Sequence, residues 1–222
     1  MKEKVVLITG SSLGIGKETA LRFAKEGFIV VITYYKDKTE ANRVANKCLL
    51  LGAEQTLVLE LNVMNNKSIV NCVDKAIERF GKIDILINNA GAIIWKELKE
   101  QSFEDIELQT RTNLEGMIKM TRQCLPHVKE AIVNIASGAG KTAYEGLAAY
   151  CATKFGARGF TQSLGKEVPN LRVISVNPGM TATRMSNYSG TLPENVAEII
   201  FNAAIGKIKP DPDKDIDVWN FT

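Results

Sequence analysis

KVVLITGSSLGIGKETA, residues 4–20, runs from a short apolar stretch through a glycine-rich loop into a helical pattern. The apolar stretch is continuous rather than alternating, which is typical of a strand buried on both faces of a sheet. The loop glycines Gly10, Gly14 and Gly16 follow a G-x3-G-x-G spacing. Glycines at such a turn let the backbone approach a pyrophosphate, which the N-terminus of the following helix attracts. The stretch therefore predicts a dinucleotide-binding turn, with a glycine turn that only packs helix against strand as the alternative.

The strand-then-helix order of this stretch repeats along the chain. Further continuous runs rich in Val and Ile lie at 28–33, 56–61, 83–88, 131–136 and 172–177. Helical patterns between the first runs end in capping glycines, at Gly27, Gly52 and Gly81. Later helices are expected over 103–125, over 149–167 and from about Pro193, with an edge strand within 215–221.

Alternating strands and helices imply right-handed crossovers, which place parallel strands in one sheet with helices on both faces. No linker, internal repeat or low-complexity segment interrupts the pattern over the 222 residues. The sequence thus predicts an α/β fold with a single doubly wound Rossmann-type domain over residues 1–222. We expect this one domain to carry both the dinucleotide site and the catalytic site.

The composition excludes several classes of function. The chain has 28 basic and 25 acidic residues without a basic stripe, so no nucleic-acid partner is expected. No apolar stretch is long enough to span a bilayer, and the N-terminus lacks a secretory signal layout, so a cytoplasmic protein without membrane contact is expected. The four cysteines form no CxxC pair and there is one histidine, so we expect reduced thiols and no metal site.

Polar residues follow most of the expected strands. In an open doubly wound sheet, ligands bind outside the carboxyl ends of the strands. The residues at these ends are Thr9 and Gly10, Tyr34 to Lys36, Asn62, Asn88 to Gly91, Ser137, and Asn177 to Gly179. Because the carboxyl ends of parallel strands meet at one edge, the sequence predicts one crevice built from six strand ends.

YCATK, residues 150–154, places Tyr150 one helical turn before Lys154. A nearby ammonium favours the phenolate and is expected to lower the pKa of the tyrosine from its usual value of about 10. A phenol tuned in this way can exchange a proton with a carbonyl or alcohol oxygen. An ordinary helix-surface contact is the alternative, and the polar strand ends favour the chemical interpretation.

Six motifs together resemble those of the short-chain dehydrogenase/reductase family, including members similar to 3-oxoacyl-carrier-protein reductases. They are TGSSLGIG (9–16), NNAG (88–91), Asn113 in TNL, Ser137 in NIAS, YCATK (150–154) and NPGMTAT (177–183). The resemblance covers residues 4–185 in the family's order and spacing. It implies a nicotinamide-dependent oxidoreductase that interconverts a ketone or aldehyde and an alcohol by hydride transfer. Such proteins are commonly homotetramers, so a homo-oligomer (dimer or tetramer) is expected.

The resemblance implies four catalytic residues. Tyr150 would act as the general acid or base, and Ser137 would hold the substrate oxygen beside the phenol. Lys154 would bind the nicotinamide ribose hydroxyls, and Asn113 would anchor a water that passes protons to Lys154. Cys151, next to Tyr150, is interpreted as a small core residue because the next helix position points about 100° away.

The resemblance also implies the residues that bind the cofactor. Asn89 and the backbone of Ala90 and Gly91 would pack against the adenine ribose. Pro178 and Gly179 would let the backbone reach the nicotinamide amide. Thr183 would bond the carboxamide or a phosphate. The expected cofactor-binding residues are Gly10, Ser12, Leu13, Gly14, Ile15, Gly16, Tyr34, Lys36, Asn62, Val63, Asn89, Ala90, Gly91, Tyr150, Lys154, Pro178, Gly179 and Thr183.

The residues after the second strand favour NADP(H) over NAD(H). An acidic residue there would bind the ribose 2′-hydroxyl of NAD. This chain has Tyr34 instead, and Thr33, Tyr34 and Lys36 are able to accept a 2′-phosphate, although Asp37 argues in the other direction. After the third strand, Asn62 stands where the family usually has an aspartate, so a weaker contact with the adenine amino group is expected.

The resemblance is weakest where the family binds its substrate. Only RMSNYSGTL (184–192) precedes the next helix, where family members commonly have a longer lid, and the glycine-rich terminal strand ending is missing. A short lid suits a 3-oxoacyl thioester, a sugar ketone or a simple carbonyl. Ile93, Ile94 and Trp95 would line one wall, or else belong to the core or a subunit interface. A non-catalytic protein that senses the cofactor ratio is the alternative, and the four catalytic residues favour the enzyme.

Overall fold

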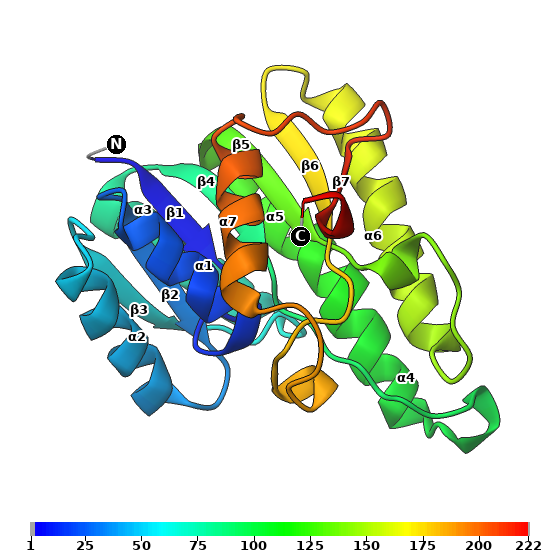
Figure 1. Ribbon diagram of the computed structural model, residues 1–222. Coiled ribbons are helices and arrows are strands. Elements are labelled where there is room, and N and C mark those ends of the chain that lie inside the picture. Colours follow the sequence, from blue (N-terminus) through cyan, green and yellow to red (C-terminus); the bar gives the residue numbers. More distant parts are fainter. Residues whose placement is uncertain (1–2, 222) are drawn as a thin grey trace.

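The computed structural model describes residues 3–221, in which one layer of strands lies between two layers of helices (Figure 1). The seven strands of this part of the chain are ordered β3-β2-β1-β4-β5-β6-β7, and all neighbouring pairs are parallel. Their bounds are β1 Val5–Ile8, β2 Ile29–Tyr34, β3 Thr56–Glu60, β4 Ile83–Asn88, β5 Val128–Ile135, β6 Arg172–Asn177 and β7 Asp215–Asp217. The order reverses between β1 and β4, which confirms the predicted doubly wound α/β fold.

Helices cover both faces of the sheet, as the alternating pattern predicts. Their bounds are α1 Gly14–Ala24, α2 Lys38–Leu50, α3 Asn66–Phe80, α4 Phe103–Thr110, α5 Gly116–Cys124, α6 Ala148–Glu167 and α7 Pro193–Ala204. Helices α1, α2 and α7 contribute to one apolar layer against the sheet, and α3, α5 and α6 contribute to the other. Figure 1 shows α1 and α7 side by side in front of the sheet.

Three aromatic rings pack together in the apolar layer between the sheet and helices α1 and α7. Phe23 on α1 packs edge-to-face against Phe28 and against Phe201 on α7, with ring centroids 5.0 Å apart in both pairs. All three side chains are fully buried. Edge-to-face pairs contribute about 0.5–1.5 kcal/mol each beyond the burial of their area. The cluster therefore holds α7 against α1. It also fixes where the segment that precedes α7 must end.

The predicted helix over 103–125 is interrupted in the structure. Residues Arg111–Glu115 form a π-helical turn between α4 and α5. At the start of α5, a Cβ on Gly116 would lie 2.7 Å from the carbonyl oxygen of Val63, so α5 approaches this neighbouring loop very closely. A π turn accommodates one additional residue in a helix and changes the direction of the side chains after it. This feature has no signature in the apolar pattern, which reads as one continuous helix.

A buried network of amides and hydroxyls connects β4 and β5 to the helices beneath them. Asn88 donates to Thr121 of α5 and to Asn134 of β5, at 2.8 Å in both cases. Asn134 in turn donates to Thr161 of α6 at 2.9 Å. Because buried polar groups are costly when unpaired, this network favours one position of α6 against the sheet.

The predicted edge strand is confirmed as β7, which runs parallel to β6. All four cysteines are free and buried, and burial raises the pKa of the Cys48 and Cys72 thiols to about 12. Among residues 3–221, no helix has the length and apolar character that crossing a membrane requires. Within the same residues, no group of three or more His, Cys, Asp or Glu is arranged to hold a metal ion. The cytoplasmic location stays a prediction.

Candidate active site

Tyr150 and Ser137 are brought together at the carboxyl edge of the sheet. Tyr150 lies in the first turn of α6 and exposes only 8% of its surface. Ser137 comes two residues after the end of β5, and its Oγ accepts a hydrogen bond from the Ala139 N–H at 3.1 Å. The Ser137 hydroxyl lies close enough to the Tyr150 phenol to offset in part the rise that burial causes in its pKa. A hydroxyl pair is thus formed by two segments that come from different elements.

Lys154 lies one turn further along α6 and is almost fully buried. Its Nζ donates a hydrogen bond to the Ile135 carbonyl oxygen at 2.9 Å and lies 5.5 Å from the Tyr150 ring centroid. A Cβ added to Gly91 would lie 3.9 Å from this Nζ. The ammonium therefore reaches from α6 to the end of β5, beside the loop that follows β4.

Burial dominates the titration of both groups. Burial raises the pKa of Tyr150, and the hydrogen bond with Ser137 offsets this only in part. Burial also lowers the pKa of Lys154 to about 8. The pKa of Tyr150 is therefore raised, whereas the sequence predicts that Lys154 lowers it. The reason is that the helical spacing shows the proximity of the two groups, whereas the loss of solvent around both is a property of the fold.

Asn113 lies on the π turn with its side chain buried. Its Oδ1 accepts from the Ala92 N–H at 2.7 Å, and its Nδ2 donates to the Ala92 carbonyl oxygen at 2.8 Å. The same Nδ2 lies 3.1 Å from Thr153 Oγ1 on α6. Asn113 therefore ties the loop after β4 to the helix of Tyr150. The water that Asn113 is expected to anchor stays a prediction.

The three glycines of the loop occupy positions where a side chain would cause strain or a close contact. Gly10 and Gly14 have φ values of +65° and +56°, in the left-handed region that favours glycine. A Cβ on Gly16 would lie 2.4 Å from both Asn89 Nδ2 and the Gly10 carbonyl oxygen. Within the described part of the chain, no side chain caps the N-terminus of α1, and its first turn carries no acidic residue. These features fit the pyrophosphate of a dinucleotide, since open backbone N–H groups attract anions.

The loop after β4 is fastened to the glycine loop through Thr9. Its Oγ1 accepts from the N–H groups of both Asn89 and Ala90, at 2.9 Å each. Asn89 Nδ2 donates to the carbonyl oxygens of Thr9 and Gly10 at 2.9 and 3.1 Å. The sequence places Thr9 at a strand end but gives no sign of this double contact. A Cβ on Gly14 would lie 3.3 Å from Thr183 Cγ2, so the motif after β6 also meets this loop.

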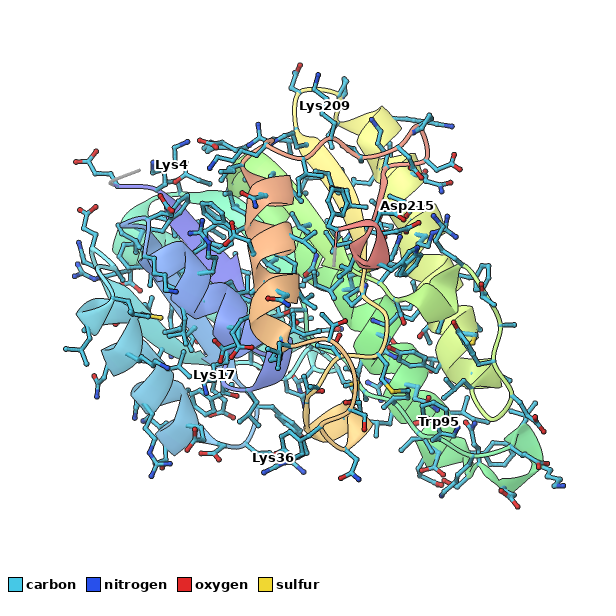
Figure 2. The ribbon with its side chains drawn as sticks, viewed as in Figure 1. Lys4, Lys17, Lys36, Trp95, Lys209 and Asp215 are labelled. Carbon is cyan, nitrogen blue, oxygen red and sulfur yellow. The ribbon has the colours of Figure 1, made fainter. Side chains whose placement is uncertain are left out.

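The end of β2 differs from the expectation for a 2′-phosphate. Thr33 is fully buried, and its Oγ1 accepts from the Gly10 N–H at 2.9 Å, so the proposed contact with phosphate is wrong for this residue. Tyr34 packs into the apolar layer of α1 and α2, because its place in the strand turns it toward the core. Lys36 is exposed at this edge (Figure 2), with Nζ 5.3 Å from the ring of Tyr35. Tyr35, which is 49% exposed, is predicted only as part of the polar strand end and is not among the expected cofactor-binding residues.

The remaining expected contacts lie around the same edge. Asn62 Oδ1 accepts from the Met64 N–H at 3.0 Å, which leaves it one further acceptor position, and Val63 is buried beneath α5. Ser12 and Ile15 are half-buried in the loop and first turn of α1, and Leu13 is exposed. The Pro178 carbonyl oxygen accepts from the Gly138 N–H at 2.8 Å, and Gly179 is exposed.

The residues expected on the substrate side separate into two groups. Ile93 packs with the cluster that contains Tyr150 and Cys151, which is buried as expected. Trp95, labelled in Figure 2, is 59% exposed and lies beside Gly146, just before α6, where an added Cβ would be 3.2 Å from its indole ring. The short segment before α7 is tied back by a bridge between Thr181 and Thr191. It exposes the apolar side chains Met180, Met185, Tyr188 and Leu192.

The sequence matches the model of the short chain dehydrogenase family over residues 4–192. The chain is 33% identical to an NADP-dependent 3-hydroxy acid dehydrogenase of Schizosaccharomyces pombe, over 90% of this chain and 86% of that protein. It is also 33% identical to the 3-oxoacyl-[acyl-carrier-protein] reductase FabG of Staphylococcus epidermidis, over 89% and 83% of the two chains.

Solved structures share the fold. A dehydrogenase/reductase from Sinorhizobium meliloti superposes with a TM-score of 0.89 at 24% identity, covering 100% of this chain and 96% of that one. A short-chain dehydrogenase/reductase from Serratia marcescens gives a TM-score of 0.87 at 23% identity, covering 97% of each chain. With the family match over most of its length, this chain belongs to the short-chain dehydrogenase/reductase family.

Proposed function

We propose that this protein is an NADP(H)-dependent oxidoreductase that interconverts a ketone or aldehyde and an alcohol, with Tyr150 as the general acid and base. Proteins of this family are oxidoreductases that use a nicotinamide dinucleotide. The observation that supports the proposal most is that the Ser137 hydroxyl lies beside the Tyr150 phenol, with Lys154 one turn away and beside the loop after β4. The glycine loop with the open N-terminus of α1 would hold the pyrophosphate.

The two hydroxyls have separate roles in this proposal. The nicotinamide supplies or accepts the hydride when it is bound. Ser137 donates a hydrogen bond that holds the substrate oxygen, and Tyr150 donates the proton to that oxygen as the alcohol forms. Because burial raises the pKa of Tyr150, the phenol stays protonated at neutral pH and is ready to act as an acid. This state favours reduction of a carbonyl over oxidation of an alcohol at neutral pH.

Lys154 and Asn113 support the same proton transfer. With its pKa lowered to about 8, the Lys154 ammonium can release a proton near neutral pH more readily than an exposed lysine. We propose that it binds the nicotinamide ribose hydroxyls and helps return a proton to Tyr150. Asn113, which fixes the loop after β4 against α6, would anchor the water in this relay.

NADP(H) is proposed over NAD(H). The name of the Schizosaccharomyces pombe relative includes NADP dependence, which supports this choice. In this chain, Lys36 is the first of two exposed lysines after β2, ahead of Lys38, and Asp37 between them accepts a hydrogen bond from the Glu40 N–H as the cap of α2. Lys36→Glu should weaken NADPH binding at least tenfold (about 1.4 kcal/mol) and NADH binding much less, measured by fluorescence titration. Equal loss for both cofactors would contradict the assignment.

The substrate is proposed to be a 3-oxoacyl compound or a related small carbonyl. The names of two relatives, a 3-hydroxy acid dehydrogenase and a 3-oxoacyl-[acyl-carrier-protein] reductase, support this class. Exposed apolar side chains on the short segment before α7, with Met180 and Met185 half-exposed, offer a surface for an acyl chain. A sugar ketone stays a second possibility for the same short lid.

We also propose a homo-oligomer that assembles through α5 and α6. Ile118 on α5 and Phe155 on α6 are 36% and 43% exposed. An open apolar groove along the π turn and the start of α5 is lined by Thr110, Leu114, Glu115, Ile118 and Lys119. Acidic and basic side chains beside apolar ones let one face pair with its own copy about a two-fold axis. Ile118→Glu should lower the mass measured by light scattering, and an unchanged oligomer would contradict this interface.

The proposed activity is tested by following NADPH oxidation with a panel of 3-oxoacyl thioesters, sugar ketones and simple aldehydes. We expect turnover with at least one carbonyl class and a preference for NADPH over NADH. A protein that only senses the cofactor ratio would bind NADPH and oxidise none of it with any carbonyl. That result would contradict the proposed function.

A further inference from the structure

Arg158 connects the helix of Tyr150 and Lys154 to the C-terminal tail. It lies one turn after Lys154 on α6, and its Nε donates to Asp215 Oδ2 at 2.8 Å. Its Nη2 bonds the same oxygen, and its Nη1 donates to the Gly140 carbonyl oxygen at 2.6 Å. The Arg158 side chain is 15% exposed and that of Asp215 is 1% exposed. The Arg158 guanidinium thus connects β7, through Asp215 (labelled in Figure 2), to the turn after β5, through Gly140.

Gly140 ends the turn that carries Ser137. Ser137 caps the short 3-10 turn Gly138–Gly140, and the Gly140 N–H donates to the Ser137 carbonyl oxygen at 2.8 Å. A Cβ on Gly140 would lie 2.7 Å from the Lys154 carbonyl oxygen. The turn therefore lies directly against the backbone of α6. A displacement of Gly140 would move Ser137 relative to the phenol on the same helix.

The tail contributes further contacts to this turn. Lys141, the next residue after the turn, lies 2.7 Å from Asp217 Oδ2 and 3.6 Å from Asp215 Oδ2. Asp217 Oδ1 accepts from Asn177 Nδ2 at 2.8 Å, which ties the tail to the end of β6. Trp219 packs against Gly138, where an added Cβ would lie 3.4 Å from the indole ring. The tail thus contacts the turn through the indole ring at Gly138 and pairs with the lysine that directly follows it.

The buried pair stays charged in the folded protein. Burial opposes ionisation of Asp215, but hydrogen bonds and charges from Arg158 and Lys141 lower its pKa overall. The hydrogen bond with Asp215 raises the pKa of Arg158 most, burial lowers it, and the charges of Asp215, Asp217 and Asp211 raise it further. A planar guanidinium can bond a carboxylate and a carbonyl at the same time, whereas a lysine ammonium at this position has no such fixed geometry.

We propose that Arg158, oriented by Asp215, is a positioning residue that fixes Gly140 and so holds the Ser137 hydroxyl beside the Tyr150 phenol. The inference rests on the proposed function, since it assumes that Ser137 and Tyr150 carry out the proton transfer. It assigns a catalytic consequence to the C-terminal tail, because the carboxylate of β7 sets the geometry of the turn after β5. An ion pair that only stabilises the fold would leave the rate of the folded enzyme unchanged.

The test compares Arg158→Lys with a matched control, Arg172→Lys, in the NADPH-bound enzyme. Arg172 also bonds a backbone carbonyl, that of Ala204 at 2.9 Å, and pairs with Glu130, but at the opposite end of β6. We expect Arg158→Lys to lower kcat at least tenfold with the NADPH dissociation constant within about twofold of wild type, since a small displacement of a catalytic group has such an effect. Arg172→Lys should keep the wild-type kcat.

A second variant separates positioning from folding. The double variant Arg158→Met/Asp215→Asn removes both buried charges, which avoids leaving one charge unpaired and lets the chain fold. It supplies no donor to the Gly140 carbonyl oxygen, so kcat should stay at least tenfold low while thermal unfolding with NADPH stays near that of wild type. Wild-type kcat in either folded variant, or an equal loss in Arg172→Lys, would overturn the inference.

The same measurements distinguish this inference from the proposed function. If wild type turns over no carbonyl, or if Tyr150→Phe keeps full activity, the proposed function fails and the inference fails with it. If wild type is active and Tyr150→Phe is inactive, wild-type kcat in Arg158→Lys removes the inference alone.

Discussion

Lys154→Met should make the cofactor-free protein more stable at neutral pH. Burial lowers the pKa of the Lys154 ammonium from 10.5 to about 8. Each pKa unit corresponds to about 1.4 kcal/mol, so holding the charged lysine costs the folded state about 3.5 kcal/mol near pH 7. Methionine removes this cost but leaves the Ile135 carbonyl oxygen without its donor, which costs about 1–3 kcal/mol. The expected net gain in the free energy of unfolding is about 0.5–2.5 kcal/mol.

The pH dependence of this difference is more diagnostic than its size. Below about pH 8 the lysine is charged in both the folded and the unfolded state, so the full penalty is present. Between about pH 8 and 10.5 the unfolded chain binds the proton and the folded protein does not. Wild-type stability therefore rises relative to Lys154→Met by up to about 1.4 kcal/mol per pH unit in this window. The advantage of the variant should shrink and then reverse.

Urea unfolding of both proteins at about pH 7, 8.5 and 10 gives the difference directly, because groups common to both proteins cancel. Lys209→Met, at an exposed lysine, is the matched control for the change of side chain. A difference in the free energy of unfolding that is constant over this pH range would refute this prediction, since it would mean that folding does not lower the pKa of Lys154.

Two further results are expected. The rate of alcohol oxidation should rise steadily from about pH 7 to pH 10, because this direction needs the Tyr150 phenolate and burial raises the pKa of Tyr150. The rate of carbonyl reduction should not change with pH near neutrality. Initial rates measured in both directions test these two expectations. Gly16→Ala should lower the thermal unfolding midpoint and NADPH affinity, since its Cβ would lie 2.4 Å from Asn89 Nδ2 and the Gly10 carbonyl oxygen. Gly165→Ala, whose Cβ has ordinary contacts of 3.5 Å or more, is the control and should leave both unchanged.

The strands and their common edge follow from the sequence alone. Continuous apolar runs mark strands that are buried on both faces, and short turns after them bring their polar ends together. For this reason Ser137 lies near Tyr150, Asn113 contacts the same helix at Thr153, and Gly10 lies against Ala90 of the loop after β4. The edge strand near the C-terminus was also predictable, because an apolar alternation at 215–217 follows a turn-like acidic stretch.

Other features depend on burial or on distant pairs, which spacing does not reveal. The sign of the Tyr150 pKa shift depends on how completely the fold removes solvent. The buried position of Tyr34 depends on which way the last residue of β2 turns. Arg158 and Asp215 are 57 residues apart in the sequence, and nothing in either segment identifies the other as its partner. The π turn at Arg111–Glu115 preserves the apolar helical pattern, so that pattern predicts an unbroken helix.

The rate of NADPH oxidation without the Tyr150 hydroxyl is the most direct test of the proposed proton transfer. In single-turnover experiments with bound NADPH and an accepted carbonyl substrate, Tyr150→Phe should reduce the rate of cofactor oxidation by at least about 100-fold, the range of a general acid, and keep its NADPH affinity. Tyr144→Phe, at a tyrosine that is 51% exposed, should react at the wild-type rate. A Tyr150→Phe enzyme that oxidises NADPH as fast as wild type would show that another group delivers the proton.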